Sequence, residues 1–179
     1  MFFLERELRR INSPIVFCHN DLLLKNIIYH EPDNRVSFID FEYSDYNYQA
    51  FDIANHFCEF CGVDDFDPQQ YPTKEFQIKW LKRYLTKWYQ LTGNTNRIDD
   101  NKQFDDDVEK LYDAVNKFSL AAHLYWGLWA LVQATNSSID FDYLNFAQKR
   151  IDEYFRRKEI LFEDECTCRL SAHNGDVSF

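Results

Sequence analysis

Three short apolar runs near the start of the chain predict β-strands. They are Ile15–Cys18, Ile27–Tyr29 and Val36–Ile39. The turn-forming segment Glu31–Asn34 separates the second run from the third, as is typical of short strands joined by tight connections. The preceding segment, Met1–Ile11, carries apolar residues at helical spacing and predicts a short amphipathic helix.

The rest of the chain follows the 3.6-residue periodicity of helices. Four helices are expected: Gln49–Phe60, Pro72 to Gly93, Phe104–Ala134 and Asp142–Arg157. The third of them is either continuous or broken. The stretch Phe118–Ala134 is apolar all round, which indicates a buried central helix. Because it contains Ser119, His123 and Gln133, a membrane span is not favoured. A few early strands and a helical majority predict an α+β fold that is mainly α.

The hydrophobic periodicity stops at Lys158. We therefore expect residues 1–157 to form one domain and residues 158–179 to be a disordered tail. A chain of 179 residues is long enough to bury a sizeable core as a single domain.

The charge balance limits the kinds of partner. Twenty basic against thirty acidic residues leave a net charge of −10, which argues against a nucleic-acid surface. A net negative charge suits a cationic small molecule or Mg²⁺ as a partner. The five cysteines are odd in number, and charges begin at Glu5, too early for the core of a signal peptide, so a cytoplasmic location is expected.

Polar residues follow the predicted strands at a spacing that suits phosphoryl transfer. His19-x-Asp21 comes first, Asn26 lies five residues beyond Asp21, and Asp40 follows the third strand. Such a reaction needs a carboxylate beside the hydroxyl, with an amide and a second carboxylate on Mg²⁺. A metal-dependent hydrolase using Asp21 and Asp40 is less favoured, because no histidine–carboxylate metal set accompanies them.

The surrounding sequence resembles a known family. HNDLLLKNIIY contains Asp21 and Asn26, and Asp40 begins DFEYSDYNYQAFDIANHFCE, which is soon followed by CGVDDFD. These stretches resemble the choline/ethanolamine kinase family, nearest to its ethanolamine kinase branch, from about Leu4 to Arg157. The resemblance implies a protein-kinase-like C-terminal lobe, with a short β-strand catalytic segment and a helical bundle. It also implies ATP-dependent phosphorylation of ethanolamine with Mg²⁺, a step of phospholipid (phosphatidylethanolamine) biosynthesis.

The same resemblance implies roles for the catalytic segment. Asp21 is expected to be the general base or the group that orients the substrate hydroxyl. Asn26 and Asp40 are the expected Mg²⁺ ligands, and Glu42 is expected beside the metal and nucleotide, through a water or a second ion. The remaining polar residues are expected to hold the loop in place: His19, Asn20, Asp52, Asn55 and His56.

A cationic substrate needs an anion and aromatic faces around it. Glu59 is the expected anion. The resemblance implies five aromatic side chains as the pocket around the substrate: Tyr43, Trp126, Trp129, Phe141 and Phe146. Paired tryptophans on an apolar helix also serve the core in many proteins, and both interpretations stay open. Phe146 stands where choline kinases tend to have tyrosine.

The nucleotide-covering parts of such a kinase have no counterpart in this sequence. The four glycines, Gly62, Gly93, Gly127 and Gly175, are too scattered to form a glycine-rich phosphate loop. The twenty residues before Asp21 offer no phosphate-binding lysine. We therefore expect a C-terminal lobe without its N-terminal lobe, which leaves the activity of this chain alone open. Two alternatives remain: the C-terminal lobe of a choline kinase, or a catalytically silent truncated module that forms a homodimer or pairs with a full-length kinase.

Overall fold

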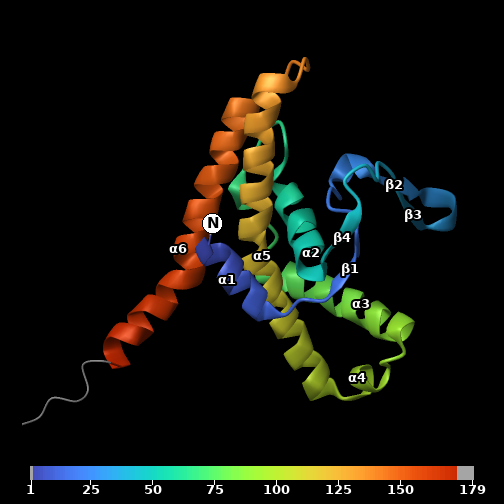
Figure 1. The fold of residues 1–179 in the computed structure, drawn as a ribbon. Helices are drawn as coiled ribbons and strands as arrows, with labels where there is room; N and C mark the ends of the chain where they lie inside the picture. The colour runs from blue at the N-terminus through green and yellow to red at the C-terminus, as the bar shows by residue number, and fades with distance from the viewer. Residues whose placement is uncertain (1, 173–179) are drawn as a thin grey trace, which may run out of the picture. The chain divides into compact units, whose positions relative to one another are not determined.

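The computed structural model describes residues 2–172, and the side chains of residues 3–162. These residues form two compact units, divided between Ala122 and His123. Helices dominate both units, and the strands are short and lie in the first (Figure 1). This confirms the predicted mainly α, α+β fold class.

The strands of the first unit pair in two separate antiparallel ladders. β1 (Ile15–Cys18) pairs with β4 (Asp45–Tyr48), and β2 (Ile27–His30) pairs with β3 (Arg35–Phe38). Between β2 and β3, a 3-10 turn, η2 (Glu31–Asp33), makes the predicted tight connection. The apolar runs predicted β1, β2 and β3, but β4 has the sequence Asp-Tyr-Asn-Tyr, without any aliphatic residue, and was missed.

Helix α2 (Gln49–Cys58) is the central support of the first unit. It contacts both β1 and β4. Ala50, Ala54, Phe57 and Cys58 have no exposed surface, and the two alanines allow the helix to approach the strands closely. η3 (Glu59–Cys61) continues from its C-terminus. The predicted helix over Gln49–Phe60 is confirmed.

The remaining helices of this unit begin and end at recognisable signals. α1 spans Phe2–Ile11, as predicted. α3 (Lys74–Thr92) begins after Thr73, whose hydroxyl accepts a hydrogen bond from the Phe76 N–H, and ends at Gly93 in the left-handed conformation. Two short helices follow no periodicity and were not predicted: η4 (Pro68–Gln70) and α4 (Asn96–Asp99).

α5 (Asn101–Asn136) is continuous and contributes its C-terminal part to the second unit. There it packs closely on α6 (Tyr143–Ala172). A Cβ added at Gly127 would lie only 3.1 Å from the Ile151 Cγ1, which shows how near the two helices lie. α6 was predicted to end at Arg157, but it continues to Ala172. The first part of the expected disordered tail is therefore helical, and residues 173–179 lie outside the described residues. In the part of the chain that the structure describes, no helix has the length and apolar character needed to span a bilayer.

Two glycines with positive φ are expected to respond differently to alanine. Gly62 has φ 83° and ψ 163°, and a Cβ there would lie 3.1 Å from the Asp65 carbonyl oxygen. Gly93 has φ 75° and ψ 13°, with open space around its Cα. Gly62→Ala should therefore lower the free energy of unfolding by about 1–3 kcal/mol, and Gly93→Ala by about 1 kcal/mol. Urea denaturation tests this, and a larger loss at Gly93 would contradict it.

Candidate active site

The loop after β1 is held by the side chains of α2. The Asp52 carboxylate accepts hydrogen bonds from the backbone N–H groups of His19 (3.1 Å) and Asn20 (2.7 Å). One turn further along α2, the Asn55 Nδ2 donates to the Asn20 carbonyl at 2.9 Å, and the His56 Nδ1 lies 2.8 Å from the Leu22 carbonyl, to which it donates. The three residues share one helix face. The prediction that these residues hold the loop in place is confirmed.

Asn20 ties this loop to the segment before α2. Its Nδ2 donates to the Tyr43 carbonyl at 2.9 Å, and its Oδ1 accepts from the Asn47 Nδ2 at 3.0 Å. Its φ is 64°, a left-handed conformation that asparagine adopts more readily than most residues. Asn20 is therefore a positioning residue, and every polar atom of its side chain is used in that role.

His19 links the same loop to the end of β3. Its Nε2 lies 2.9 Å from the Ile39 carbonyl, so the ring donates to the residue directly before Asp40. The ring also packs against Phe41, with 4.9 Å between the ring centroids. Asp40 itself has φ 63° and is exposed. His19 therefore sets the position of the loop that carries Asp40, which confirms a structural role.

Asp21 and Asn26 form the buried pair at the centre of the site. Asp21 is 9% exposed and Asn26, in the 3-10 turn η1 (Leu24–Asn26), is 6% exposed. The Asn26 Nδ2 donates to the Asp21 carbonyl at 2.9 Å and to the Asp21 Oδ2 at 3.3 Å. The amide is thus oriented by Asp21, and its Oδ1 is the atom suited to a hard cation.

Three further carboxylates act on this pair. Burial, and then the negative charges of Glu59, Asp40 and Glu42, raise the pKa of Asp21 to about 7, against the Asn26 hydrogen bond that lowers it. Like charges that lie near a carboxyl group disfavour its ionisation. Asp21 is therefore within electrostatic reach of Glu59, Asp40 and Glu42, and this concentration of negative charge favours a cation. Among the described residues no cluster of three or more His, Cys, Asp or Glu side chains forms a ready-made metal site.

The predicted aromatic residues of the second unit form one cluster. Trp126 and Trp129 meet edge to face at 5.3 Å between ring centroids, and Phe141 lies 5.7 Å from Phe146. Tyr143 connects the two pairs, at 5.8 Å from Trp129 and 4.9 Å from Phe141. Tyr143 was not predicted as part of this cluster, although its spacing of two from Phe141 and three from Phe146 was a usable signal. The other two expected substrate residues, Tyr43 and Glu59, lie in the first unit.

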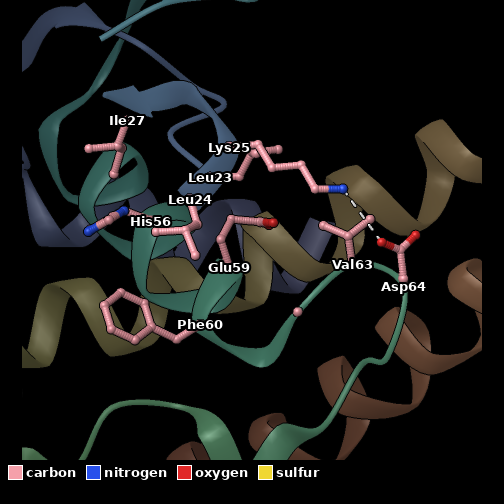
Figure 2. A pocket seen from close by; sticks show the side chains of 10 residues that line it. Leu23, Leu24, Lys25, Ile27, His56, Glu59, Phe60, Val63 and Asp64 are labelled. Atoms are coloured by element: carbon pink, nitrogen blue, oxygen red, sulfur yellow. Dashed lines mark ion pairs between the residues drawn. The ribbon is translucent and has the colours of Figure 1, made fainter. Parts of the chain in front are cut away.

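The first unit also contains a cavity of about 540 Å³ beside the catalytic loop. Figure 2 shows its wall, which includes Glu59 and a Lys25–Asp64 ion pair. Most of the lining is apolar and was not predicted: Leu23, Leu24, Ile27, Phe60 and Val63. These residues come from segments that are far apart in sequence, so no local pattern could identify them.

Asp21 and His123 are expected to give stability opposite pH dependences. The folded chain takes up a proton at Asp21 near pH 7, whereas the unfolded chain does so only near the ordinary pKa of 3.8. At Asp21, the free energy of unfolding therefore increases as the pH falls from 7 towards 4. Burial, and then the charge of Arg150, hold the pKa of His123 well below 6.5 in the folded chain. As the pH falls through 6.5, the unfolded chain binds a proton at this histidine and the folded chain does not. At His123, the free energy of unfolding therefore decreases as the pH falls.

Urea denaturation at about pH 7.5 and pH 5.5 checks these signs. On acidification, Asp21→Asn should lose more stability than the unaltered chain, and His123→Gln should lose less or gain. One unmatched proton changes the free energy of unfolding by about 1.4 kcal/mol per pH unit. The same response in all three chains would contradict the prediction.

Comparisons with known proteins agree with this geometry. A family model described as "Choline/ethanolamine kinase" matches residues 1–155. The chain is 52% identical to the Drosophila melanogaster ethanolamine kinase over 151 residues, 84% of this chain and 27% of that protein. It is 48% identical to the Mus musculus ethanolamine kinase 1 over 158 residues, 88% of this chain and 42% of that protein. The chain thus spans about a quarter to two fifths of the length of these relatives.

Solved structures show the same likeness. An ethanolamine kinase from Plasmodium vivax superposes with a TM-score of 0.73 at 36% identity, covering 86% of this chain and 37% of the other. A choline kinase from Cryptosporidium parvum superposes with a TM-score of 0.67 at 29% identity, covering 89% of this chain and 43% of the other.

Proposed function

Because the chain belongs to the choline/ethanolamine kinase family, we propose that it forms the part of an ethanolamine kinase that receives the substrate hydroxyl. The reaction transfers the γ-phosphoryl group of ATP to the oxygen of ethanolamine and yields phosphoethanolamine and ADP. We place this step in phosphatidylethanolamine biosynthesis in the cytoplasm. The observation that carries the proposal is the buried Asp21–Asn26 pair, 3.3 Å between Oδ2 and Nδ2, within a group of further carboxylates.

Asp21 is suited to take the hydroxyl proton. Its pKa of about 7 lies near neutral pH, where a general base combines a substantial deprotonated fraction with a useful proton affinity. In the reaction the substrate O–H bond breaks and its proton passes to an Asp21 oxygen. The substrate oxygen forms the new bond to the γ-phosphorus as the bond from that phosphorus to the bridging oxygen of ATP breaks, and ADP leaves. The braces from Asp52 and Asn20 hold Asp21 in place, which matters because phosphoryl transfer depends strongly on alignment.

The oxygen donors of Asn26 and Asp40 fit Mg²⁺. This ion prefers oxygen ligands and commonly takes one or two carboxylates together with waters and substrate phosphates. Asp40 is exposed, and the Asn26 amide is oriented through its Nδ2, which leaves its Oδ1 as the metal-binding atom. When bound, Mg²⁺ would neutralise charge on the phosphate oxygens. We assign Glu42 to a second ion or a metal-bound water beside the nucleotide.

Glu59 is the proposed partner of the substrate ammonium. It is half-buried, and its charge acts on Asp21, so an amino alcohol can place its ammonium near one carboxylate and its hydroxyl near the other. We propose that Tyr43 adds an aromatic face to this ammonium site. A substrate-binding role for the aromatic residues of the second unit stays a prediction from the family resemblance: Trp126, Trp129, Phe141 and Phe146.

A chimera tests the proposal. The N-terminal part of the Drosophila melanogaster relative, up to the start of the matched region, is joined to this chain and supplied with ATP, Mg²⁺ and ethanolamine. Formation of phosphoethanolamine above the level of the N-terminal part alone is expected. A folded chimera that binds nucleotide and Mg²⁺ but makes no product would refute the assignment.

Choline is the alternative substrate, supported by the likeness to the Cryptosporidium parvum choline kinase. Ethanolamine is favoured because the ethanolamine kinase from Plasmodium vivax is more similar to this chain, at 36% identity, than that choline kinase, at 29%. Competition between the two substrates in the chimera decides this. A kcat/KM higher for choline would reverse the assignment.

Pairing with a second copy or with a full-length kinase is a further proposal. It is supported by apolar side chains on β1 and β4 that are more than half exposed: Ile15, Phe17 and Tyr46. Sedimentation of the purified chain, compared with a Phe17→Ser, Tyr46→Ser variant, tests it. A chain that stays monomeric, both alone and with a full-length relative, would contradict pairing.

A further inference from the structure

A side-chain hydrogen bond joins the catalytic loop to residues 40–44, which form the Asp40 loop. The Asn20 Nδ2 donates to the Tyr43 carbonyl at 2.9 Å. Asn20 directly precedes Asp21, so this bond links the immediate neighbour of one carboxylate to the loop that carries the other. The bond exists only while the Nδ2 of the Asn20 amide, rather than its Oδ1, points towards Tyr43.

Asn47, on β4, fixes the direction of that amide. The Asn47 Oδ1 accepts a hydrogen bond from the Tyr48 N–H at 2.8 Å, and the Asn47 Nδ2 donates to the Asn20 Oδ1 at 3.0 Å. The row of two amides thus begins at a backbone N–H, which can only donate, and ends at the Tyr43 carbonyl, which can only accept. Neither amide can turn over without placing two donors or two acceptors against each other.

The side chain and the backbone of Asn20 are held by different elements. The backbone N–H and carbonyl are held from α2, by Asp52 at 2.7 Å and by Asn55 at 2.9 Å. The side chain is held from β4, whose pairing with β1 places Asn47 opposite Val16. Because Asn20 is only 8% exposed, its amide depends on protein partners more than on water. Loss of the Asn47 donor should therefore turn the Asn20 amide and leave the backbone of the loop in place.

We propose that Asn47 is a positioning residue for phosphoryl transfer: it orients the Asn20 amide towards Tyr43 and thereby holds the Asp40 loop in place relative to Asp21. The inference rests on the proposed function in one respect, the assignment of Asp40 as a Mg²⁺ ligand. Asn47 acts through Asn20 and needs no contact with the metal, the nucleotide or the amino alcohol. The proposal adds a residue of β4, outside both loops, to the groups on which the reaction depends.

A Mg²⁺ titration of the isotope-labelled chain, followed by NMR in buffer without nucleotide, tests the proposal without turnover. The variant is Asn47→Asp, whose carboxylate can still accept from the Tyr48 N–H but cannot donate to the Asn20 Oδ1. The dissociation constant of Mg²⁺, measured from the backbone amide shifts of Asp40 and Glu42, should rise about 10–100-fold, as is usual when an outer contact of a metal ligand is lost. The added negative charge would by itself favour the cation, so a weaker affinity cannot come from charge.

Three further measurements separate positioning from stability. Asn34→Asp makes the same chemical change at the exposed end of the turn η2 and should leave the Mg²⁺ affinity unchanged. Thr73→Ala removes the cap of α3, outside both loops, and should lower stability without changing the Mg²⁺ affinity. In an Asn20→Ala chain, Asn47→Asp should change the affinity by less than about twofold, because the side chain through which Asn47 acts is absent.

The chimera adds a kinetic measurement to the binding measurement. Asn47→Asp should lower kcat about tenfold and raise the Mg²⁺ concentration that gives half the maximal rate. The KM for ethanolamine should change by less than about threefold, since no group that contacts ethanolamine is altered. An equal effect on all three quantities would indicate a general loss of structure and contradict the proposal.

Each outcome of the titration decides the matter. An unchanged Mg²⁺ affinity in a folded Asn47→Asp chain overturns the inference, and so does an equal loss in Thr73→Ala or an undiminished effect in the Asn20→Ala chain. If the unaltered chain does not bind Mg²⁺, the metal assignment and the inference are both overturned. An inactive chimera together with the expected affinities refutes the proposed function and supports the role of Asn47. An active chimera with unchanged affinities refutes the role of Asn47 alone.

Discussion

Replacing Asp21 by asparagine in the chimera is expected to lower kcat by about 10²–10⁴-fold. The asparagine preserves the shape of the side chain. Its Oδ1 can still accept the hydrogen bond that the Asn26 Nδ2 donates to the Asp21 Oδ2 at 3.3 Å in the unaltered chain. It cannot accept the substrate proton. Because the change removes a charge that acts in the transition state, KM for ethanolamine should change by only a few fold.

Asp33→Asn serves as the matched control for this variant. Asp33 lies in the exposed turn η2 between β2 and β3, where its carboxylate pairs with Arg35 at 3.3 Å. The same chemical change there should leave kcat unaltered. If Asp21→Asn retains more than about a tenth of the activity, Asp21 is not the proton acceptor, and alignment alone accounts for the rate.

Replacing Asp52 by alanine is expected to have the largest effect on stability, about 2–5 kcal/mol. Asp52 accepts from two backbone N–H groups, at 3.1 Å from His19 and 2.7 Å from Asn20, in a loop whose residues are buried. Alanine leaves both donors without their charged acceptor, and each such loss costs about 1–3 kcal/mol. Asp52→Asn retains one acceptor and should cost about half as much.

Chemical denaturation of the chain measures this loss, and Asp106→Ala provides the control. Asp106 is exposed near the start of α5, where its removal should cost less than about 1 kcal/mol. In the chimera, Asp52→Ala should also lower kcat, since the backbone of the catalytic loop loses its anchor. A folded Asp52→Ala variant as stable as the Asp106→Ala control would show that other contacts hold the loop.

Local patterns in the sequence predicted most of the longer elements and the residue types of the site. The apolar runs predicted β1, β2 and β3, and the helical periodicity with Gly93 at its end predicted α3. The spacing of Asp21, Asn26 and Asp40 indicated phosphoryl transfer, because that chemistry needs those groups at short range. Three residues of α2 at helical spacing also pointed correctly to a brace for the loop.

Local patterns failed where a segment depends on a partner distant in sequence. β4 has no aliphatic run and is extended because it pairs with β1, about thirty residues earlier in the chain. α6 continues past Arg157 although the apolar periodicity weakens there, since helix propagation adds one hydrogen bond for each further residue.

The sequence alone therefore determined which groups are available for chemistry, and the tertiary structure decided what those groups can do. Asp21 is an ordinary aspartate in the sequence. Its pKa rises to about 7 because folding buries it and brings Glu59, from beyond α2, near it. The cavity beside Glu59 likewise exists only where the catalytic loop meets the segment after α2. Burial and electrostatic fields depend on distances in space, and chain order does not contain these distances.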